Sequence, residues 1–283
     1  MTIALAIKVN DGLVLAADSA STLSSLKADG GQDFFNVYDN ANKMVNLHKG
    51  LPIGVLTWGQ GEINDHSIGT LLKDLRLRFE GGSAHHLDWK IDPENYQISG
   101  VSNKVRKYFY EELLKNGSRI INNDNYLLGL LIGGYSSSSM DPESYTLTIL
   151  STSCIGPTQV LQKSGAVWHG QPEAISRLLL GFSSNITLAL QNLGVSPNDS
   201  EIYTERLKQQ TAITLIVPSM PIQDVIDLAK FLVETTVQFT KFAPGSNSVG
   251  GPIEIASMTR HEGFKWISRK LYYPLELNPR EAK

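Results

Sequence analysis

The beginning of the chain contains two apolar segments joined by a turn, and they constrain the fold more than any other part of the sequence. Residues 3–8 alternate Ile or Leu with Ala before ending at Lys8, and residues 13–17 are almost continuously apolar. Asn10-Asp11-Gly12 between them is typical of a tight hairpin turn, because these residue types tolerate a positive φ. Strands that are apolar on both faces are covered on both faces. The pattern predicts a hairpin at the centre of a layered structure.

Strands and helices follow in blocks instead of alternating. Strands are expected at 43–48, 51–58, 126–135, 145–152, 158–162 and, as the last strand, 252–259, which leads into residues 263–268. Helices are expected at 62–80, 93–116, 171–193 (interrupted at 181–184) and from Ser219 and Pro221 onward. Residues 19–42 are expected to form a long loop with a short strand at 34–38, Trp168-His169-Gly170 a loop, and residues 198–210 no decided structure. Block order favours an α+β fold over a parallel doubly wound sheet. We predict a four-layer αββα sandwich of two antiparallel sheets, one domain over residues 1–283 with a tail at about 270–283.

The composition excludes several classes of function. The chain has 283 residues and a net charge of −3, which is no basic footprint for nucleic acid. One cysteine, Cys154, rules out an intrachain disulfide and fits a reducing compartment. No signal segment or membrane-length apolar run is evident, so a cytoplasmic protein without membrane contact is expected. His85 and His86 are adjacent, which suits a solvated loop better than a metal pair, and no metal or cofactor is expected.

The second residue, Thr2, is a candidate nucleophile. Met1 precedes a small side chain, so its removal is expected to leave a free α-amino group on Thr2. A threonine at a free N-terminus carries both a hydroxyl nucleophile and an amine that can act as its base. Many proteins begin with Met-Thr, so the context decides the interpretation. Here the residue stands at the start of a predicted apolar strand.

Three further residues could support such a nucleophile. Asp18 ends the strand expected to pair with the strand that Thr2 begins, and Lys43 begins the next strand. A buried lysine beside an aspartate can stay charged and lower the pKa of a nearby hydroxyl. Gly59 follows the strand at 53–58, where an uncovered N–H could meet an oxyanion. Taken one by one, each also suits a plain turn or a solvated strand edge; their order behind Thr2 favours the functional interpretation.

Four segments carry a resemblance to a known family. Residues 2–8 (TIALAIK), 12–19 (GLVLAADS), 42–44 (NKM) and 54–59 (GVLTWG) resemble proteasome β-type subunits, which are N-terminal nucleophile hydrolases. Residues 248–254 (SVGGPIE) and 132–134 (IGG) are more similar to the bacterial ancestral β-subunit (Anbu-like) homologues than to archaeal or eukaryotic subunits.

The resemblance implies an αββα fold, assembly into rings or helical stacks, and threonine-type hydrolysis of amide bonds. By position it makes Thr2 the nucleophile, Asp18 and Lys43 the charge pair, Gly59 the oxyanion donor and Ser19 a further residue of the site. It implies a peptide or unfolded-protein substrate and a homo-oligomer, and an ATPase partner would follow from kinship alone. The residues leave two alternatives open, a catalytically silent ring or scaffold subunit and an amidase for small non-peptide amides.

Three places depart from the family pattern. The loop over 19–42 is longer than usual, Trp168-His169-Gly170 stands where core-particle subunits carry a serine, and residues 245–249 (GSNSV) lack the usual aspartate. His169 could supply a hydrogen bond near the amine, although a single histidine in a loop is more often unrelated to catalysis. The missing aspartate and the segment Trp168-His169-Gly170 favour the silent alternative, and the long loop makes the match of Lys43 depend on its strand context.

Overall fold

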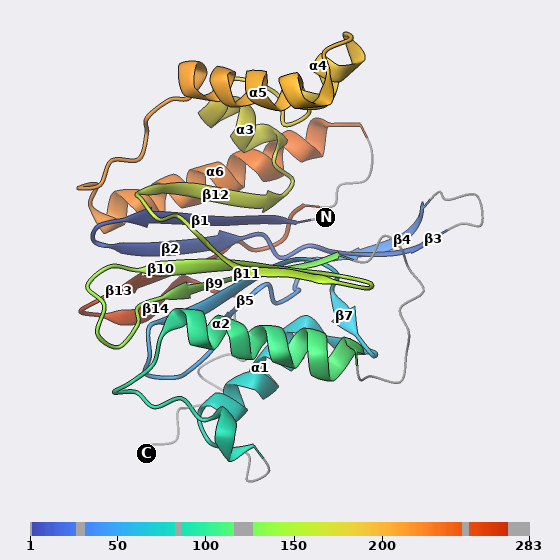
Figure 1. Ribbon diagram of the computed structural model, residues 1–283. Coiled ribbons are helices and arrows are strands. Elements are labelled where there is room, and N and C mark those ends of the chain that lie inside the picture. The colour runs from blue at the N-terminus through green and yellow to red at the C-terminus, as the bar shows by residue number, and fades with distance from the viewer. Residues whose placement is uncertain (1, 27–31, 83–85, 116–126, 245–248, 271–283) are drawn as a thin grey trace.

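Two five-stranded antiparallel sheets form the centre of the molecule (Figure 1). The computed structural model describes residues 2–26, 32–82, 86–115, 127–244 and 249–270. The first sheet has the order β12 (Gly165–Gly170), β1 (Ile3–Val9), β2 (Gly12–Ala17), β13 (Glu254–Thr259) and β14 (Gly263–Ser268). The second has the order β11 (Cys154–Val160), β10 (Glu143–Leu150), β9 (Leu127–Gly134), β6 (Ile53–Gly59) and β5 (Met44–Asn46). The two antiparallel sheets predicted from the sequence are confirmed.

The alternation along β1 explains why this strand is apolar on both faces. Ile3, Leu5 and Ile7 pack in a cluster with helix residues outside the first sheet. Ala4 and Ala6 belong instead to a cluster that contains residues of both sheets. Small side chains on the inner face let the two sheets approach each other closely. Both faces of β1 are therefore buried, as the apolar pattern requires.

Helices cover the outer faces of the sheets. The helices α1 (Ile68–Phe79), α2 (Ile98–Arg106) and the π-helix that continues α2 (Lys107–Lys115) lie against the second sheet, together with the 3-10 turn Leu87–Trp89. The helices α3 (Glu173–Leu180) and α6 (Ile222–Phe242) lie against the first sheet. Figure 1 shows the resulting order of layers from top to bottom, with α6 above the sheets and α1 and α2 below them.

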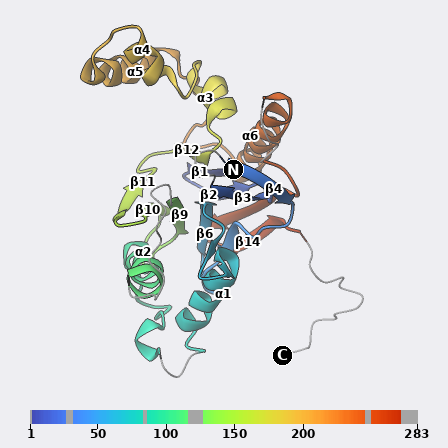
Figure 2. The ribbon, with the colours of Figure 1, turned by 90° about the vertical axis from the view of Figure 1, so that its right-hand side faces the viewer.

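A helical hairpin made of α4 (Ile186–Asn192) and α5 (Pro197–Thr211) projects from the body (Figure 2). No residue of α4 is buried, and Ser200 is the buried residue of α5. Its apolar side chains are exposed instead, with exposed fractions of 57% at Leu188 and 82% at Leu193. This hairpin lacks a core of its own in a single chain.

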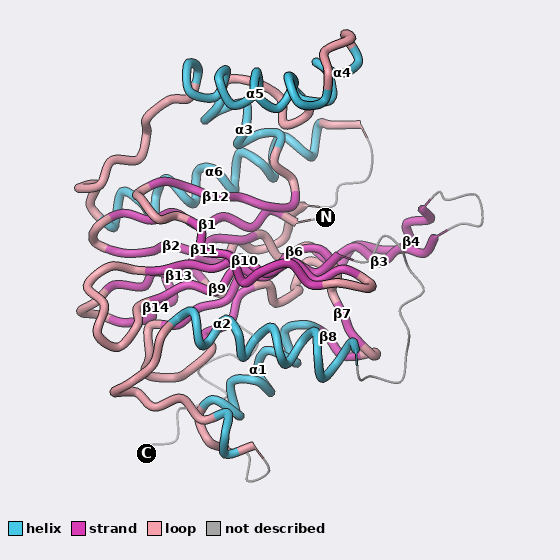
Figure 3. Tube along the Cα trace, in the orientation of Figure 1, coloured by secondary structure: helices cyan, strands magenta, loops and turns pink. Residues whose placement is uncertain are grey.

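Two strand predictions need correction. Residues 19–42, expected to be a loop with one short strand, contain the two-stranded ribbon β3 (Ser21–Leu26) and β4 (Gln32–Tyr38), which extends beyond the sheets (Figure 3). Trp168-His169-Gly170, expected in a loop, lies in the edge strand β12, which pairs with β1 over Ile3↔Gly170 to Lys8↔Gly165. A strand supported by a neighbouring strand needs little propensity of its own.

Helix boundaries also differ from expectation. The helix predicted over 62–80 begins only at Ile68, after a small hairpin of β7 (Glu62–Ile63) and β8 (His66–Ser67), and Ser67 caps it through a bond from Thr70 N (3.2 Å). The helix predicted over 93–116 begins at Ile98, and the undecided residues 198–210 are helical within α5. Ser219 does not cap α6, because the residue before this helix is Pro221 and no side chain caps it.

Some expectations concern parts of the chain that the structure does not describe. His85, residues 245–248 and the tail beyond Lys270 lie outside the described residues. The single-domain organisation stays a prediction. In the described part of the chain, none of the helices combines the length and the apolar character needed to cross a bilayer.

Candidate active site at the start of strand β1

The carboxylate of Asp18 is the centre of the candidate site. It is fully buried, and each of its two oxygens accepts two hydrogen bonds. Oδ1 accepts from the Ile3 N–H (3.0 Å) and from the Lys43 ammonium (2.7 Å). Oδ2 accepts from the Ala20 N–H (3.2 Å) and the Gly250 N–H (3.0 Å). With four hydrogen bonds to its two oxygens, this buried carboxylate joins four segments of the chain.

Lys43 lies against this carboxylate and is itself almost completely buried. Its side chain is 7% exposed. Its backbone is held against β6, because the Thr57 N–H donates to the Lys43 carbonyl (2.8 Å). Burial lowers the pKa of the Lys43 ammonium below its ordinary value of 10.5, while the negative charge of Asp18 acts in the opposite direction. The pair therefore holds a cation that gives up its proton more readily than a solvated lysine.

Thr2 lies at the opening of β1, between two neighbouring strands. The residue is 5% exposed, and its carbonyl accepts a hydrogen bond from the Gln171 N–H (2.7 Å). Gly170 makes this approach possible: its φ is +93°, and a Cβ there would lie 1.8 Å from the Thr2 oxygen. On the other side, the amide that follows Thr2 donates to Asp18. The residue directly after Thr2 therefore binds the same Asp18 oxygen that binds Lys43.

The backbone N–H of Gly59 points away from the neighbouring strand β9. Thr57 N points to the β5 side of β6, where it donates to Lys43 O, whereas Gln60 N points to the β9 side and donates to Leu127 O (2.9 Å). Backbone groups alternate sides along a strand, so the Gly59 N–H points to the β5 side, past the point where β5 begins. Gly59 has a φ of +89°, and a Cβ there would lie 2.2 Å from Leu127 O.

A stacked pair of rings connects the ends of β6 and β12. Trp58 and His169 lie face to face, with ring centroids 3.9 Å apart and planes 1° from parallel. Gly129, opposite Trp58 in β9, leaves room for the indole, because a Cβ there would lie 1.9 Å from Trp58 Cε2. Burial lowers the pKa of His169 to about 4, so the imidazole is neutral at physiological pH. His169 therefore borders the candidate site, next to Gly170 in β12.

The structure brings Ser19 to the site and adds two residues that the sequence did not reveal. Ser19 is fully buried, and its hydroxyl accepts a hydrogen bond from the Lys270 ammonium (2.8 Å). Lys270 in turn lies 2.8 Å from Glu254 Oε2, an ion pair without the alignment of a hydrogen bond. The available signal for Glu254 was a carboxylate between two isoleucines at the start of an apolar strand. Lys270, far away in sequence, gave no signal.

Two face-to-face antiparallel sheets, with a buried Asp–Lys pair at the start of the first strand, make up a proteasome-like fold. The comparison with solved structures agrees: the chain is similar to the helical assembly of the Anbu complex from Pseudomonas aeruginosa, with a TM-score of 0.51 and 14% identity over 96% of this chain and 88% of that one. No protein-family model and no curated protein matches the chain. The predicted resemblance is confirmed for the fold.

Proposed function

We propose that this protein is a threonine-type N-terminal nucleophile hydrolase of the proteasome β-subunit kind, with the αββα fold of that superfamily, and that it cleaves peptide bonds. The observation that carries the proposal is the Asp18 carboxylate, which binds both the amide after Thr2 (3.0 Å) and the Lys43 ammonium (2.7 Å). An ion pair this deeply buried is costly to build. Because the pair lies beside the first residue of β1, we infer that it supports the nucleophile Thr2.

The reaction would proceed in two steps on the side chain of Thr2. The free α-amine takes the proton from the Thr2 hydroxyl, directly or through a water, while the nearby Lys43 cation favours the alkoxide. The oxygen attacks the amide carbonyl, and the Gly59 N–H donates to the resulting oxyanion. The tetrahedral intermediate expels the amine product, which receives the proton from the Thr2 ammonium. Water, deprotonated by the Thr2 amine, then hydrolyses the ester and restores the free hydroxyl.

Assembly into a homo-oligomer is part of this proposal. The similar Anbu complex is described as a helical assembly. In this chain, the α4–α5 hairpin has exposed apolar side chains and almost no buried residue, as expected of a surface that a second subunit covers. Leu77 on α1 is another exposed apolar side chain, 51% exposed. Tyr110 is partly buried and packs against the core behind the second sheet.

A covalent probe tests the catalytic proposal. The purified full-length protein is treated with a peptide β-lactone or epoxyketone, and the adduct is located by intact mass and peptide mapping. We expect removal of Met1 and an adduct on Thr2, together with loss of both adduct and turnover in Thr2→Ala. An unmodified Thr2 in a protein whose Met1 has been removed would contradict the proposal and favour the silent scaffold subunit. Turnover of small amides but not of a peptide library would favour the amidase.

A further inference from the structure

A second buried ion pair lies directly beside the first. Lys270 and Glu254 have side chains that are 5% and 2% exposed, and the ammonium lies 2.8 Å from Glu254 Oε2. The same ammonium donates to the Ser19 hydroxyl (2.8 Å) and to the Ala41 carbonyl (2.7 Å). The chemistry proposed for Thr2 assigns no task to this pair.

The contacts of Lys270 reach both segments that carry the first ion pair. Ser19 directly follows Asp18, and Ala41 precedes Lys43 by two residues. The two segments are joined to each other by the Ala41 N–H, which donates to the Ser19 carbonyl (2.9 Å). One ammonium therefore fixes the position of the Asp18 segment relative to the Lys43 segment.

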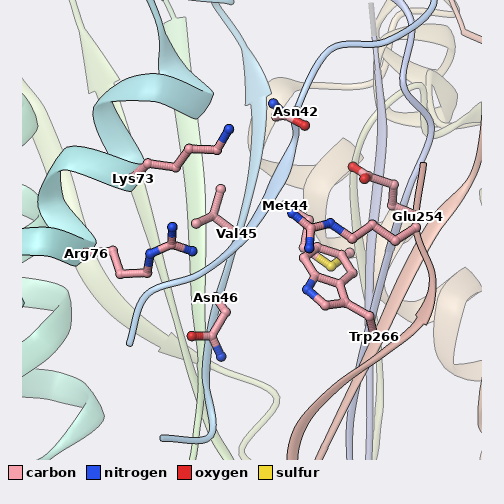
Figure 4. A pocket seen from close by; sticks show the side chains of 9 residues that line it. Asn42, Met44, Val45, Asn46, Lys73, Arg76, Glu254 and Trp266 are labelled. Carbon is pink, nitrogen blue, oxygen red and sulfur yellow. The ribbon is translucent and has the colours of Figure 1, made fainter. Parts of the chain in front are cut away.

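Glu254 approaches from the neighbouring strand. In the pairing of β13 with β2, Glu254 lies opposite Ala17, the residue that precedes Asp18 in the sequence. Figure 4 shows its carboxylate at the edge of a pocket whose opposite wall, on α1, carries Lys73 and Arg76. Arg269 also lines this pocket, so Glu254 is the acidic residue in a basic surrounding.

Stability alone does not account for this arrangement. Removing two charges from water costs free energy that their attraction repays only in part, and well-packed apolar side chains of similar volume are often at least as stabilising. The surrounding clusters show that this fold has ample apolar material. A second charged pair placed against the first points to an electrostatic and positioning task.

We propose that the Lys270–Glu254 pair positions the Asp18–Lys43 pair and controls the charge on Lys43. The inference rests on the proposed hydrolase function only for the catalytic role of the charge on Lys43. Lys270 and Glu254 act through other residues, so they are positioning residues and not catalytic ones.

The charges around Lys43 support this inference and give it a sign. Apart from burial, the pKa of Lys43 is raised by Asp18, lowered by Lys270 and raised by Glu254. The remaining group near the site is the amine proposed at Thr2. Lys73 and Arg76 line the wall of the pocket opposite Glu254, and Arg269 lines the same pocket. Removing the Lys270 cation should therefore raise the pKa of Lys43, and removing the Glu254 anion should lower it.

The test compares Lys270→Met with Glu254→Gln in the full-length chain. Lysine labelled with ¹³C at Cε reports the titration of Lys43 by NMR, with Lys43→Arg to assign the signal and exposed Lys230→Met as control. We expect the midpoint to move up in Lys270→Met and down in Glu254→Gln, each by on the order of one pH unit. Midpoints that stay unchanged, or that move in the same direction in both variants, would overturn the inference.

Activity gives a second readout, separate from the first. We expect kcat of Lys270→Met to fall by about tenfold to a hundredfold with little change in KM, because small misplacements of reacting groups are costly, and Lys270→Arg to restore most of it. The alkaline limb of the pH profile should follow the NMR midpoint. If the protein shows no turnover, the opposite NMR shifts still test the ion pair, so failure of the proposed function is distinguishable. If Lys270→Met does not fold, Glu254→Gln and Lys270→Arg decide.

Discussion

Trp58 of the second sheet and His169 of the first stack face to face, with 3.9 Å between their ring centroids. This contact joins the ends of β6 and β12 where Gly59 and Gly170 border the candidate site. The Nε2 atom of His169 is buried without a hydrogen-bond partner among the described residues. The imidazole is thus held by its ring face, in the neutral form.

This burial makes stability depend on pH. The pKa of His169 is about 4 in the folded protein, against about 6.5 in an unfolded chain, so only the unfolded state binds the proton between these values. The free energy of unfolding should fall as pH decreases from about 6.5 towards 4. Between pH 7.5 and pH 5 the loss from this group is about 1–2 kcal/mol after allowance for partial exposure. Urea denaturation of His169→Phe should show a correspondingly smaller loss, whereas an unchanged pH dependence would contradict this, with the exposed His66→Phe as control.

The Asp18–Lys43 pair should show strong coupling in a double-mutant cycle. Lys43→Met leaves the Asp18 carboxylate buried without its cation, and Asp18→Asn leaves the ammonium unpaired. Each single change should cost about 3–5 kcal/mol of unfolding free energy. The double variant should be more stable than the sum predicts, with a coupling energy of at least about 2 kcal/mol, yet remain inactive. Chemical denaturation combined with an activity assay measures both, and additive effects would show that the two residues are not paired.

Gly59→Ala is expected to damage the site more than a glycine change elsewhere. The new Cβ would lie 2.2 Å from Leu127 O at a φ of +89°, so the end of β6 must shift and the N–H with it. Gly50 is the matched control, because its φ is +91° with no atom within 4 Å of the added Cβ. Gly50→Ala should cost about 1 kcal/mol and leave turnover unchanged, and Gly59→Ala should lower kcat by about a hundredfold. Equal turnover in the two variants would exclude Gly59 as the oxyanion donor.

The apolar surface of the α4–α5 hairpin predicts the response of assembly to mutation. Wild-type protein in dilute buffer should scatter light as a multiple of its 31.1 kDa chain mass. A charge at Leu193, which is 82% exposed, should dissociate the assembly if the hairpin is the interface. Met140→Glu is the control, since Met140 is 69% exposed and lies in the connection between β9 and β10. A wild-type mass of one chain would contradict the prediction.

Part of this structure could be predicted from sequence because it is local. The β1–β2 hairpin follows from apolar patterning and the turn at Asn10 and Asp11. The pairing of Asp18 with Lys43 could be anticipated because each stands at an end of a strongly patterned strand. The order of blocks, strands then helices, indicated the two antiparallel sheets.

The rest depends on contacts that sequence patterns do not encode. β12 is a strand because β1 offers it a free edge, and the residues Gly165–Gly170 carry no strong strand pattern of their own. The β3–β4 ribbon includes polar residues such as Ser24, Ser25 and Asn36, which are typical of a loop when taken singly. Lys270 reaches Ser19 across 251 positions, and no local signal identifies such a partner.

The four bonds to Asp18 also determine when in the life of the chain the site comes into being. One of them comes from Gly250, 232 positions away in the sequence. The neighbouring Ser19 accepts a hydrogen bond from Lys270, 251 positions away. Contacts between such distant positions form only after the intervening chain exists and has closed a large loop. A nascent chain in which Gly250 and Lys270 have not yet been synthesised therefore lacks groups that complete the site. With Thr2 as the proposed nucleophile, hydrolytic competence arises only after these two residues have left the ribosome.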